Sequence, residues 1–266
     1  MDISQWLAAA QTALENSSTA RLDALVLLED CLAMDRAQVL AHPETKLTAS
    51  QIKTLRSQLS RRAKHEPLAY IRGVTEFYGR DFLIDHRVLE PRPESETIIE
   101  LLKGLALPAK PQIVDVGTGS GALAITAKLE LPQAEVSAVD IDPGCLEVAQ
   151  KNAHKHAVQV TFHLSNLLEQ IHQPADVLLC NLPYVPDDFH INEAALHEPK
   201  LAIFGGASGL DLYLRLFEQI ANAGFKPAHI LTESLPTQHH ALAELARRHS
   251  YIQTKKEDFI QLFEPA

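Results

Sequence analysis

The stretch IVDVGTGSGALAI, residues 113 to 125, predicts how the second half of the chain folds. An apolar run ends at Val116, three glycines follow at alternate positions, and a second apolar run begins at Ala122. This order of strand, glycine turn and helix is typical of α/β sheets, in which the turn after a strand can approach a ligand closely because glycine has no Cβ. The stretch therefore predicts a ligand-binding turn at the carboxyl end of a strand.

Apolar runs of strand length alternate with helical patterns from residue 111 onward. We predict five strands, at Gln112–Val116, Glu135–Asp140, Gln159–Leu164, Ala175–Cys180 and His229–Glu233. Helices are expected between most of them, for example from Pro143 to about Lys155, and a further helix runs from about Ser95 to Leu105. Such alternation favours a mostly parallel sheet with helices on both faces, whose ligands bind outside the carboxyl ends of the strands.

The N-terminal part of the chain reads as a separate helical domain. Leucines recur at helical spacing, at Leu22, Leu25, Leu28 and Leu32. Thr48 and Gln51 form a capping box before another apolar stripe, and the aromatic segment around Gly79 predicts a β-hairpin. We therefore expect a helical domain at residues 1–75, a hairpin and linker at 76–94 and an α/β domain at 95–266.

Composition narrows the class of protein. The chain has 266 residues, 46% of them hydrophobic, but it has no apolar run of membrane-spanning length and no signal-peptide pattern at its start. Its three cysteines lack metal-binding or disulfide spacing, which predicts reduced thiols and a cytoplasmic location. The 13 histidines show no ligand spacing backed by acids or thiols, so we expect no metal site.

The charge of the chain bears on its partners. The formal net charge is −10, which argues against nonspecific binding to nucleic acid. Residues 51–80 are an exception, since they contain seven basic side chains: Lys53, Arg56, Arg61, Arg62, Lys64, Arg72 and Arg80. This basic set is either a solvated helix face or a docking surface for a macromolecule.

Two acids indicate what the glycine turn binds. Asp140 ends the next predicted strand, 19 positions after Gly121, where a carboxylate can accept both hydroxyls of a ribose. With Ala122 the turn also fits the dinucleotide fingerprint G-x-G-x-x-A. Asp115 stands two residues before Gly117, where it would repel a pyrophosphate but would suit a ligand with ammonium and sulfonium groups. This favours S-adenosylmethionine over NAD and over a glycine turn that only packs a helix on the sheet.

The stretch CNLPYVP, residues 180 to 186, ends the fourth predicted strand. In a sheet that binds S-adenosylmethionine this end faces the activated methyl group. The side-chain oxygen of Asn181 and the carbonyl of Leu182 could accept the two N–H bonds of a planar NH2 and direct its nitrogen at the methyl carbon. Pro183 restricts residue 182 to an extended conformation, and Tyr184 could stack on the planar group.

A family resemblance rests on these residues and on several longer stretches. NLPY is similar to the N-P-P-Y motif of amino-group methyltransferases. The stretches ARLDALVLLEDCL, HEPLAYIRGVTEFYGRDFLID, LEPRPESE, VDVGTGSGALAI, AVDIDPGCLEVAQKNA and EPKLAIFGGASGLDLYLRL resemble the release-factor glutamine methyltransferases, the HemK family, in the family's order. The resemblance covers about residues 20 to 263.

The resemblance implies a fold, an activity and a set of site residues. The fold would be an α/β, Rossmann-like class I methyltransferase sheet with a small N-terminal helical domain joined by a β-hairpin. The enzyme would transfer methyl from S-adenosyl-L-methionine to the glutamine side-chain amide in the Gly-Gly-Gln loop of a peptide chain release factor, which the helical domain would help to grip. The catalytic residues would be Asn181, Leu182, Pro183 and Tyr184. The cofactor would be held by Asp115, Gly117, Thr118, Gly119, Ser120, Gly121, Asp140, Asn166, Leu167 and Asn181.

The sequence departs from the family pattern at several of these positions. Leu182 replaces the first proline of N-P-P-Y but keeps the carbonyl that the mechanism uses. Asn166 stands where the family usually has aspartate near the adenine amino group, Leu167 where an aromatic residue is frequent, and Ser95 where the family has threonine. Three alternatives stay open: an N6-adenine methyltransferase of DNA or RNA, a ribosomal-protein glutamine methyltransferase, and a cofactor-binding scaffold without turnover. The expected partner is a release factor, with no direct contact to nucleic acid or membrane.

Overall fold

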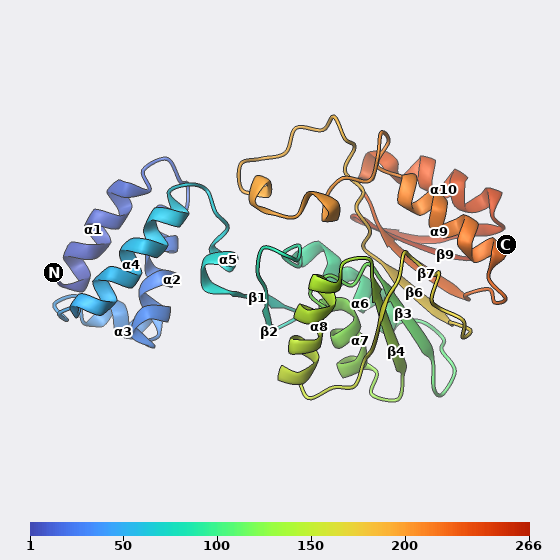
Figure 1. The fold of residues 1–266 in the computed structure, drawn as a ribbon, viewed down its shortest axis with the longest axis horizontal. Coiled ribbons are helices and arrows are strands. Elements are labelled where there is room, and N and C mark those ends of the chain that lie inside the picture. The colour runs from blue at the N-terminus through green and yellow to red at the C-terminus, as the bar shows by residue number, and fades with distance from the viewer. The chain divides into compact units, whose positions relative to one another are not determined.

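The computed structural model describes all 266 residues of the chain, which fall into two compact units. The first unit comprises residues 1–73 and the short segment 192–197, and the second comprises residues 74–191 and 198–266. Figure 1 labels their helices and strands. The first unit's main segment ends at Gly73, and the hairpin belongs to the second unit.

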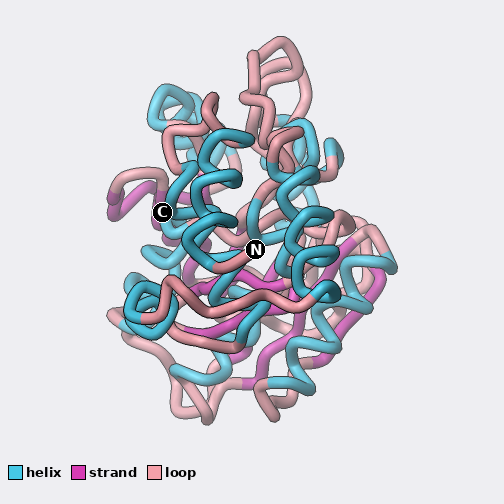
Figure 2. The backbone as a smooth tube through the Cα atoms, turned by 90° about the vertical axis from the view of Figure 1, so that its left-hand side faces the viewer, coloured by secondary structure: helices cyan, strands magenta, loops and turns pink.

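The first unit contains helices and no strand, since every strand of the chain lies after residue 73 (Figure 2). Its helices are α1 (Ile3–Ala13), α2 (Ala20–Leu32), α3 (Arg36–Ala41), α4 (Ala49–Arg62) and α5 (Leu68–Arg72). Trp6, Leu28 and Leu55 are buried together in its core. The predicted capping box is confirmed at the start of α4, where Thr48 accepts a hydrogen bond from the backbone N–H of Gln51.

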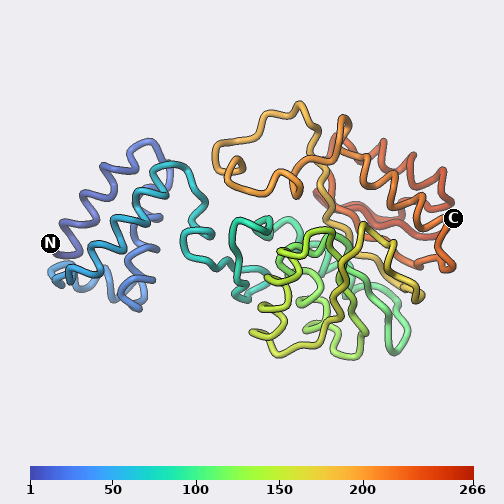
Figure 3. The backbone as a smooth tube through the Cα atoms, viewed as in Figure 1, coloured from blue at the N-terminus to red at the C-terminus, as the bar shows by residue number.

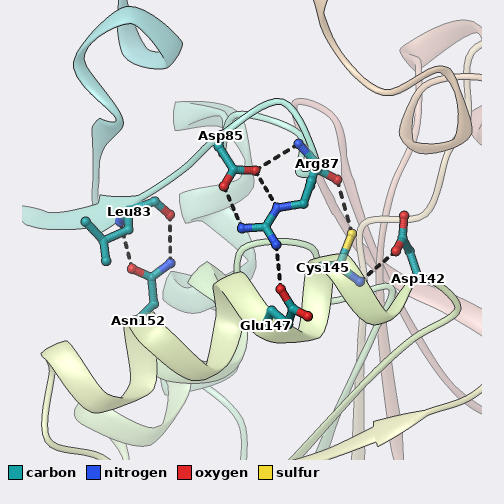
Figure 4. Close-up of polar contacts among 8 residues, drawn as sticks. Leu83, Asp85, Arg87, Asp142, Cys145, Glu147 and Asn152 are labelled. Atoms are coloured by element: carbon teal, nitrogen blue, oxygen red, sulfur yellow. Dashed lines mark hydrogen bonds and ion pairs between the residues drawn. The ribbon is translucent and has the colours of Figure 1, made fainter.

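The hairpin predicted around Gly79 consists of β1 (Val74–Phe77) and β2 (Arg80–Leu83), which pair antiparallel. It is bonded to α8 (Pro143–Lys155), because the Asn152 side chain exchanges two hydrogen bonds with the backbone of Leu83 (Figure 4). Beyond β2, Arg87 bridges Asp85 and Glu147 in the same view. The segment after the hairpin is therefore fixed against the sheet domain and is not a free linker.

The second unit is built on a seven-stranded sheet with the order β5-β4-β3-β6-β7-β9-β8. Its strands are β3 (Gln112–Val116), β4 (Glu135–Asp140), β5 (Thr161–Leu164), β6 (Val177–Cys180), β7 (His229–Glu233), β8 (Tyr251–Glu257) and β9 (Ile260–Pro265). The first five are parallel and correspond to the five predicted strands, whereas β9 and β8 pair antiparallel at one edge. This is the mostly parallel α/β sheet that the sequence predicts.

Helices cover both faces of this sheet (Figure 1). One face packs against α6 (Glu96–Lys103), α7 (Ala122–Glu130) and α8, with Ile98, Leu123 and Ala153 in its core. The other packs against α9 (Asp211–Asn222) and α10 (His239–Arg248), through Phe217 and Leu242. None of the helices has the length and apolar character needed to cross a membrane.

The register of the strands decides which side chains meet at the edge of the sheet. Val116 pairs with both Val139 and Cys180, and Cys180 pairs in turn with Thr232. Strands β3, β4, β6 and β7 therefore end at almost the same level. After β6 the chain runs to α9 without strand or α-helix, as the long yellow-to-orange loop in Figure 3 shows.

Candidate active site

A cavity of about 240 Å³ lies at the carboxyl ends of β3, β4 and β6, where the fold class places its ligands. Every residue that lines it belongs to the second unit. The lining includes the turns after these strands, the stretch that leads into α6 and the loop that leads to α9. One water occupies about 30 Å³ in the liquid, so the cavity has room for a ligand.

The glycine turn after β3 has the backbone conformation that only glycine adopts at low cost. Gly117, Gly119 and Gly121 have φ of 76°, 55° and 82°. A Cβ added to Gly119 would meet no protein atom within 4 Å, although its backbone lines the cavity. A Cβ on Gly121 would instead lie 3.0 Å from the Ala149 side chain, so that glycine serves helix packing. Gly119 is thus the point at which a ligand can reach the backbone.

Asp140, at the end of β4, lines the cavity with most of its side chain buried. Its carboxylate accepts hydrogen bonds from the backbone N–H groups of Gly119, at 2.9 Å, and Asp142, at 3.0 Å. Burial raises the pKa of Asp140, and these two N–H groups counteract part of the rise. A carboxylate offers about four acceptor sites, so acceptor capacity remains for the hydroxyls of a ribose.

Asp115 occupies a different place from the one its sequence position suggested. It is buried, it does not line the cavity, and one of its oxygens accepts from the Thr118 hydroxyl at 2.6 Å and the Ala124 N–H at 3.1 Å. Its other oxygen, Oδ1, is buried without a hydrogen-bond partner. Burial raises the pKa of Asp115 to about 7. The residue holds the glycine turn to the start of α7 and does not itself face the cavity, so the expected direct contact with the ligand is not seen.

Asn166 and Leu167 line the cavity after β5, as expected, but Asn166 is already engaged. Its Oδ1 accepts from Arg215 at 3.0 Å and its Nδ2 donates to Glu169 at 2.7 Å. An amide oxygen has two lone pairs, so Oδ1 can still accept one N–H. Leu167 has φ of 54° and is buried, and its carbonyl accepts from the Ser165 hydroxyl at 2.8 Å. The pair offers an apolar wall and one acceptor to a flat base.

Asn181 follows β6 and lines the cavity with one side of its amide held. Its Nδ2 donates to the Ser95 hydroxyl at 2.8 Å, and that hydroxyl donates to Glu233 at 2.5 Å. Its Oδ1 accepts no hydrogen bond from the protein, so an acceptor is available at the cavity. Burial raises the pKa of Glu233, and the hydroxyls of Ser95 and Tyr184 counteract the rise.

Leu182 replaces a proline of the family motif. Its side chain is packed against other residues and does not fill the cavity. Its side chain is buried in the apolar cluster on the α9 face, and its Cδ2 lies 3.1 Å from where a Cβ on Gly117 would be. The leucine side chain therefore packs against the glycine turn at Gly117, on the α9 side of the sheet. The Leu182 carbonyl accepts no hydrogen bond from the protein, so it too remains available.

Pro183 lines the cavity, and Tyr184, which does not, donates its hydroxyl to Glu233 at 2.9 Å. The backbone of both residues is held by the segment GGASG, residues 205–209. A Cβ on Gly205 would collide with the Pro183 carbonyl, and one on Gly209 with the Tyr184 carbonyl. These glycines let two backbone segments pack directly, which fixes the conformation of the NLPY turn.

The residues around the cavity fit S-adenosylmethionine. The uncovered backbone at Gly119 can receive the ligand, and the Asp140 carboxylate keeps acceptor capacity for a ribose. The free Oδ1 of Asn181 offers a further acceptor at the same cavity. These features agree with a nucleoside ligand that carries a ribose.

Comparison with known proteins identifies the family. The family described as PrmC N-terminal domain matches residues 5–73, and the one described as Ribosomal protein L11 methyltransferase (PrmA) matches residues 93–183. A release factor glutamine methyltransferase of Koribacter versatilis is 42% identical, over 75% of this chain and 74% of the relative. One from Escherichia coli is 34% identical, over 88% of this chain and 86% of the relative. The chain belongs to the release factor glutamine methyltransferase family.

Solved structures of lower similarity share the fold of this family member. A methyltransferase from Pyrococcus furiosus aligns with a TM-score of 0.52 at 17% identity, covering 81% of this chain and 97% of its own. The 16S rRNA N2 G1207 methyltransferase of T. thermophilus, solved with AdoMet and guanosine, aligns with a TM-score of 0.51 at 19% identity, covering 72% and 49%. The predicted class I methyltransferase fold is confirmed.

The structure brings most of the predicted site residues of this family member to one cavity. Three polar residues that support the site were not assigned to it from sequence: Ser95, Glu233 and Gln238, the last of which donates to the Tyr184 carbonyl at 2.8 Å. A sequence signal existed for Glu233, because it ends the predicted strand His229–Glu233 and ligands in such sheets bind at the carboxyl ends of the strands. Ser95 offered only its place in the LEPRPESE stretch.

Proposed function

We propose that the Asn181 side-chain oxygen and the Leu182 carbonyl receive the NH2 group of the substrate glutamine in the cavity. The enzyme is an S-adenosylmethionine-dependent protein-(glutamine-N5) methyltransferase that modifies a release factor, as its family membership establishes. The observation that carries the proposed site is the Asn181 amide, whose nitrogen is held by Ser95 and whose oxygen stays free beside the glycine turn.

The chemical difficulty of the reaction lies in the amide nitrogen that receives the methyl group. An amide nitrogen shares its lone pair with the carbonyl and is a poor nucleophile. Two fixed acceptors that take both of its N–H bonds fix the plane of the NH2 and point the nitrogen at the methyl group. S-adenosylmethionine supplies that methyl group in activated form. No side chain has to remove a proton before transfer, since the proton can leave afterwards.

The remaining residues of the site hold the cofactor in this proposal. Gly117 and Gly119 present backbone to it, together with Thr118, Ser120 and Gly121 of the same turn, and Asp140 accepts from its ribose. Asn166 and Leu167 border its base. Asp115 acts through the turn that it anchors. Pro183 lines the substrate side, and Tyr184, whose hydroxyl donates to Glu233, helps to fix the turn and does not line the cavity.

The partner and the location of the enzyme complete the proposal. The helical first unit takes part in binding the release factor, and the methylated glutamine is the one in the Gly-Gly-Gln loop that the family resemblance implies. The acidic net charge of −10 supports a protein partner over a nucleic acid. A cytoplasmic location, predicted from the cysteine content, stays a prediction.

Labelled methyl transfer to a release factor tests this function. The protein is incubated with methyl-labelled S-adenosylmethionine and a release factor, in parallel with a release factor whose Gly-Gly-Gln glutamine is replaced by alanine. We expect label on the unaltered factor and none on the alanine variant. Label on the alanine variant would refute the site of transfer, and label that appears only on added DNA or RNA would favour an adenine methyltransferase.

A further inference from the structure

A chain of three hydrogen bonds links Asn181 to Tyr184 through Ser95 and Glu233, which were not among the predicted site residues. Asn181 Nδ2 donates to Ser95 Oγ at 2.8 Å, Ser95 Oγ donates to Glu233 Oε2 at 2.5 Å, and Tyr184 Oη donates to Glu233 Oε1 at 2.9 Å. Ser95 and Glu233 are 2% and 1% exposed, so water does not compete for these bonds.

The chain has a fixed direction. An ionised carboxylate can only accept, so each oxygen of Glu233 accepts a hydrogen bond from a hydroxyl, one from Ser95 and one from Tyr184. A serine hydroxyl carries a single proton, and Ser95 uses it in the hydrogen bond that it donates to Glu233. Toward Asn181, the Ser95 oxygen can therefore only accept, and of the two ends of an amide only the NH2 can donate.

The direction matters because an amide is nearly symmetric in shape. If the Asn181 amide turned over, its oxygen would face the Ser95 oxygen with no proton between them, and its NH2 would take the place of Oδ1. A substrate NH2 would then meet a donor in place of an acceptor. The orientation of the Asn181 amide that can accept the glutamine NH2 thus depends on Ser95 and Glu233, which lie outside the NLPY motif.

We propose that Ser95 and Glu233 are positioning residues that hold the Asn181 amide with its oxygen, and not its NH2, toward the substrate nitrogen. The fold places them by different means. Glu233 ends β7 beside the residue that follows β6, because Cys180 pairs with Thr232. Ser95 ends a short 3-10 turn, Pro93–Ser95, at the start of α6. The proposal rests on the function proposed above and adds the origin of its selectivity for an NH2 group.

Four variants of the full-length enzyme test the proposal. Ser95→Ala removes the acceptor for Asn181, and Ser95→Thr restores it. Glu233→Gln offers an NH2 that can donate to Ser95, which frees the serine proton to point at Asn181. Thr232→Val is the matched control, since Thr232 is fully buried on the same strand and its hydroxyl has no hydrogen-bond partner.

Methyl transfer to a release factor is measured as kcat and KM, together with S-adenosylmethionine binding by calorimetry, thermal unfolding, and the NMR signals of the Asn181 side-chain NH2. We expect Ser95→Ala to lower kcat by about 10- to 100-fold, with cofactor affinity unchanged and the Asn181 signals shifted. Glu233→Gln should also lower kcat. Ser95→Thr and Thr232→Val should keep the wild-type kcat and the wild-type Asn181 signals.

The outcomes separate this proposal from the function on which it rests. An inactive wild type, or full activity in Asn181→Ala, would contradict the function itself. With an active wild type, the positioning role is overturned if Ser95→Ala or Glu233→Gln transfers methyl at the wild-type rate. It is equally overturned if Thr232→Val loses as much kcat as Ser95→Ala, because the effect would then be general to the end of β7.

Discussion

In this account, single residues decide whether the cavity binds a cofactor and recognises the substrate amide. The glycine turn uses Gly117, Gly119 and Gly121 for three different ends: contact with Leu182, access for a ligand, and packing on α8. From the sequence we predicted a ligand turn that uses all three glycines, but the sequence could not separate these uses. The separation depends on which atoms face each glycine, and those come from other parts of the chain.

Gly119→Ala tests the ligand-facing glycine. Its φ of 55° strains any side chain, at a cost of roughly 1–2 kcal/mol in the free energy of unfolding. The added methyl also fills space that the cofactor needs, so S-adenosylmethionine affinity should fall at least about tenfold. Calorimetric titration and urea unfolding measure the two effects.

Gly79→Ala is the matched control for that change. Gly79 has φ of 68°, and a Cβ there also meets no atom within 4 Å, but it lies in the hairpin turn and does not line the cavity. It should lose similar stability and no cofactor affinity. Equal cofactor affinity in the two variants would show that Gly119 is not at the ligand.

Asp115 predicts a pH dependence of stability. Burial raises its pKa from 3.8 to about 7 in the folded state, so between these values the folded protein keeps a proton that the unfolded chain has released. Its contribution to stability is therefore full at low pH and is lost as pH rises through about 7. Asp115→Asn removes this titration.

Unfolding free energies of wild type and Asp115→Asn, measured by urea denaturation from pH 4 to pH 7 without cofactor, test this sign. The unfolding free energy of the variant should rise relative to that of the wild type as pH rises, by up to about 4 kcal/mol. Asp188→Asn, at an exposed loop aspartate, should run parallel to the wild type. A constant difference between Asp115→Asn and wild type would show that Asp115 folds with its charge.

At the scale of secondary-structure elements, the sequence was most informative where the hydrophobic periodicity and the residues that end an element indicate the same bounds. The strands at Gln112–Val116, Glu135–Asp140 and His229–Glu233 and the helix at Pro143–Lys155 have the predicted bounds. Strands β8 and β9 were not predicted. All residues of β8 after Tyr251 are exposed, so its sequence carries no buried alternation, and its place at the sheet edge depends on pairing with β9.

The residues that support the site could likewise not be predicted from local sequence patterns. Ser95 and Glu233 are 138 positions apart, and only the register of β6 with β7 and the start of α6 bring them together. The NLPY turn and the glycine turn, by contrast, are short local motifs whose chemistry can be read directly. Most residues that the sequence proposed for ligands therefore line one cavity, whereas the residues that hold them in place were not proposed.

The capping box of α4 gives a prediction for one element. Thr48 caps the backbone N–H of Gln51, so Thr48→Ala should lower the unfolding free energy by about 1 kcal/mol and leave kcat for methyl transfer unchanged. Thr54→Ala, at an exposed threonine within the same helix, is the control and should cost no stability. Equal losses of stability in the two variants, measured by urea denaturation, would show that the effect is not specific to the cap.

For the whole molecule, charge and its distribution bear on the choice of partner. Four members of the basic set are engaged in ion pairs with acids of their own unit: Arg61 with Glu66, Arg62 with Asp23, Arg72 with Asp30 and Arg80 with Glu130. Lys53, Arg56 and Lys64 form no ion pair. Most of the set is therefore used within the fold, which weakens it as a surface for phosphates.

Competition by nucleic acid tests this conclusion. A nucleic-acid methyltransferase binds its target largely through phosphates, so excess duplex DNA or RNA would occupy the enzyme at low salt. We expect the rate of methyl transfer to a release factor at 50 mM salt to be unchanged by such a competitor. Strong inhibition that disappears as salt is raised would instead point to a nucleic-acid site.

The most direct test of the account is single-turnover methyl transfer by Asn181→Ala, with S-adenosylmethionine affinity measured on the same sample. Asn181 contributes the side-chain acceptor, while the glycine turn and Asp140 remain intact. The account predicts that transfer to the release factor falls about 100-fold or more while cofactor affinity stays within a few-fold. Transfer at the wild-type rate would contradict it.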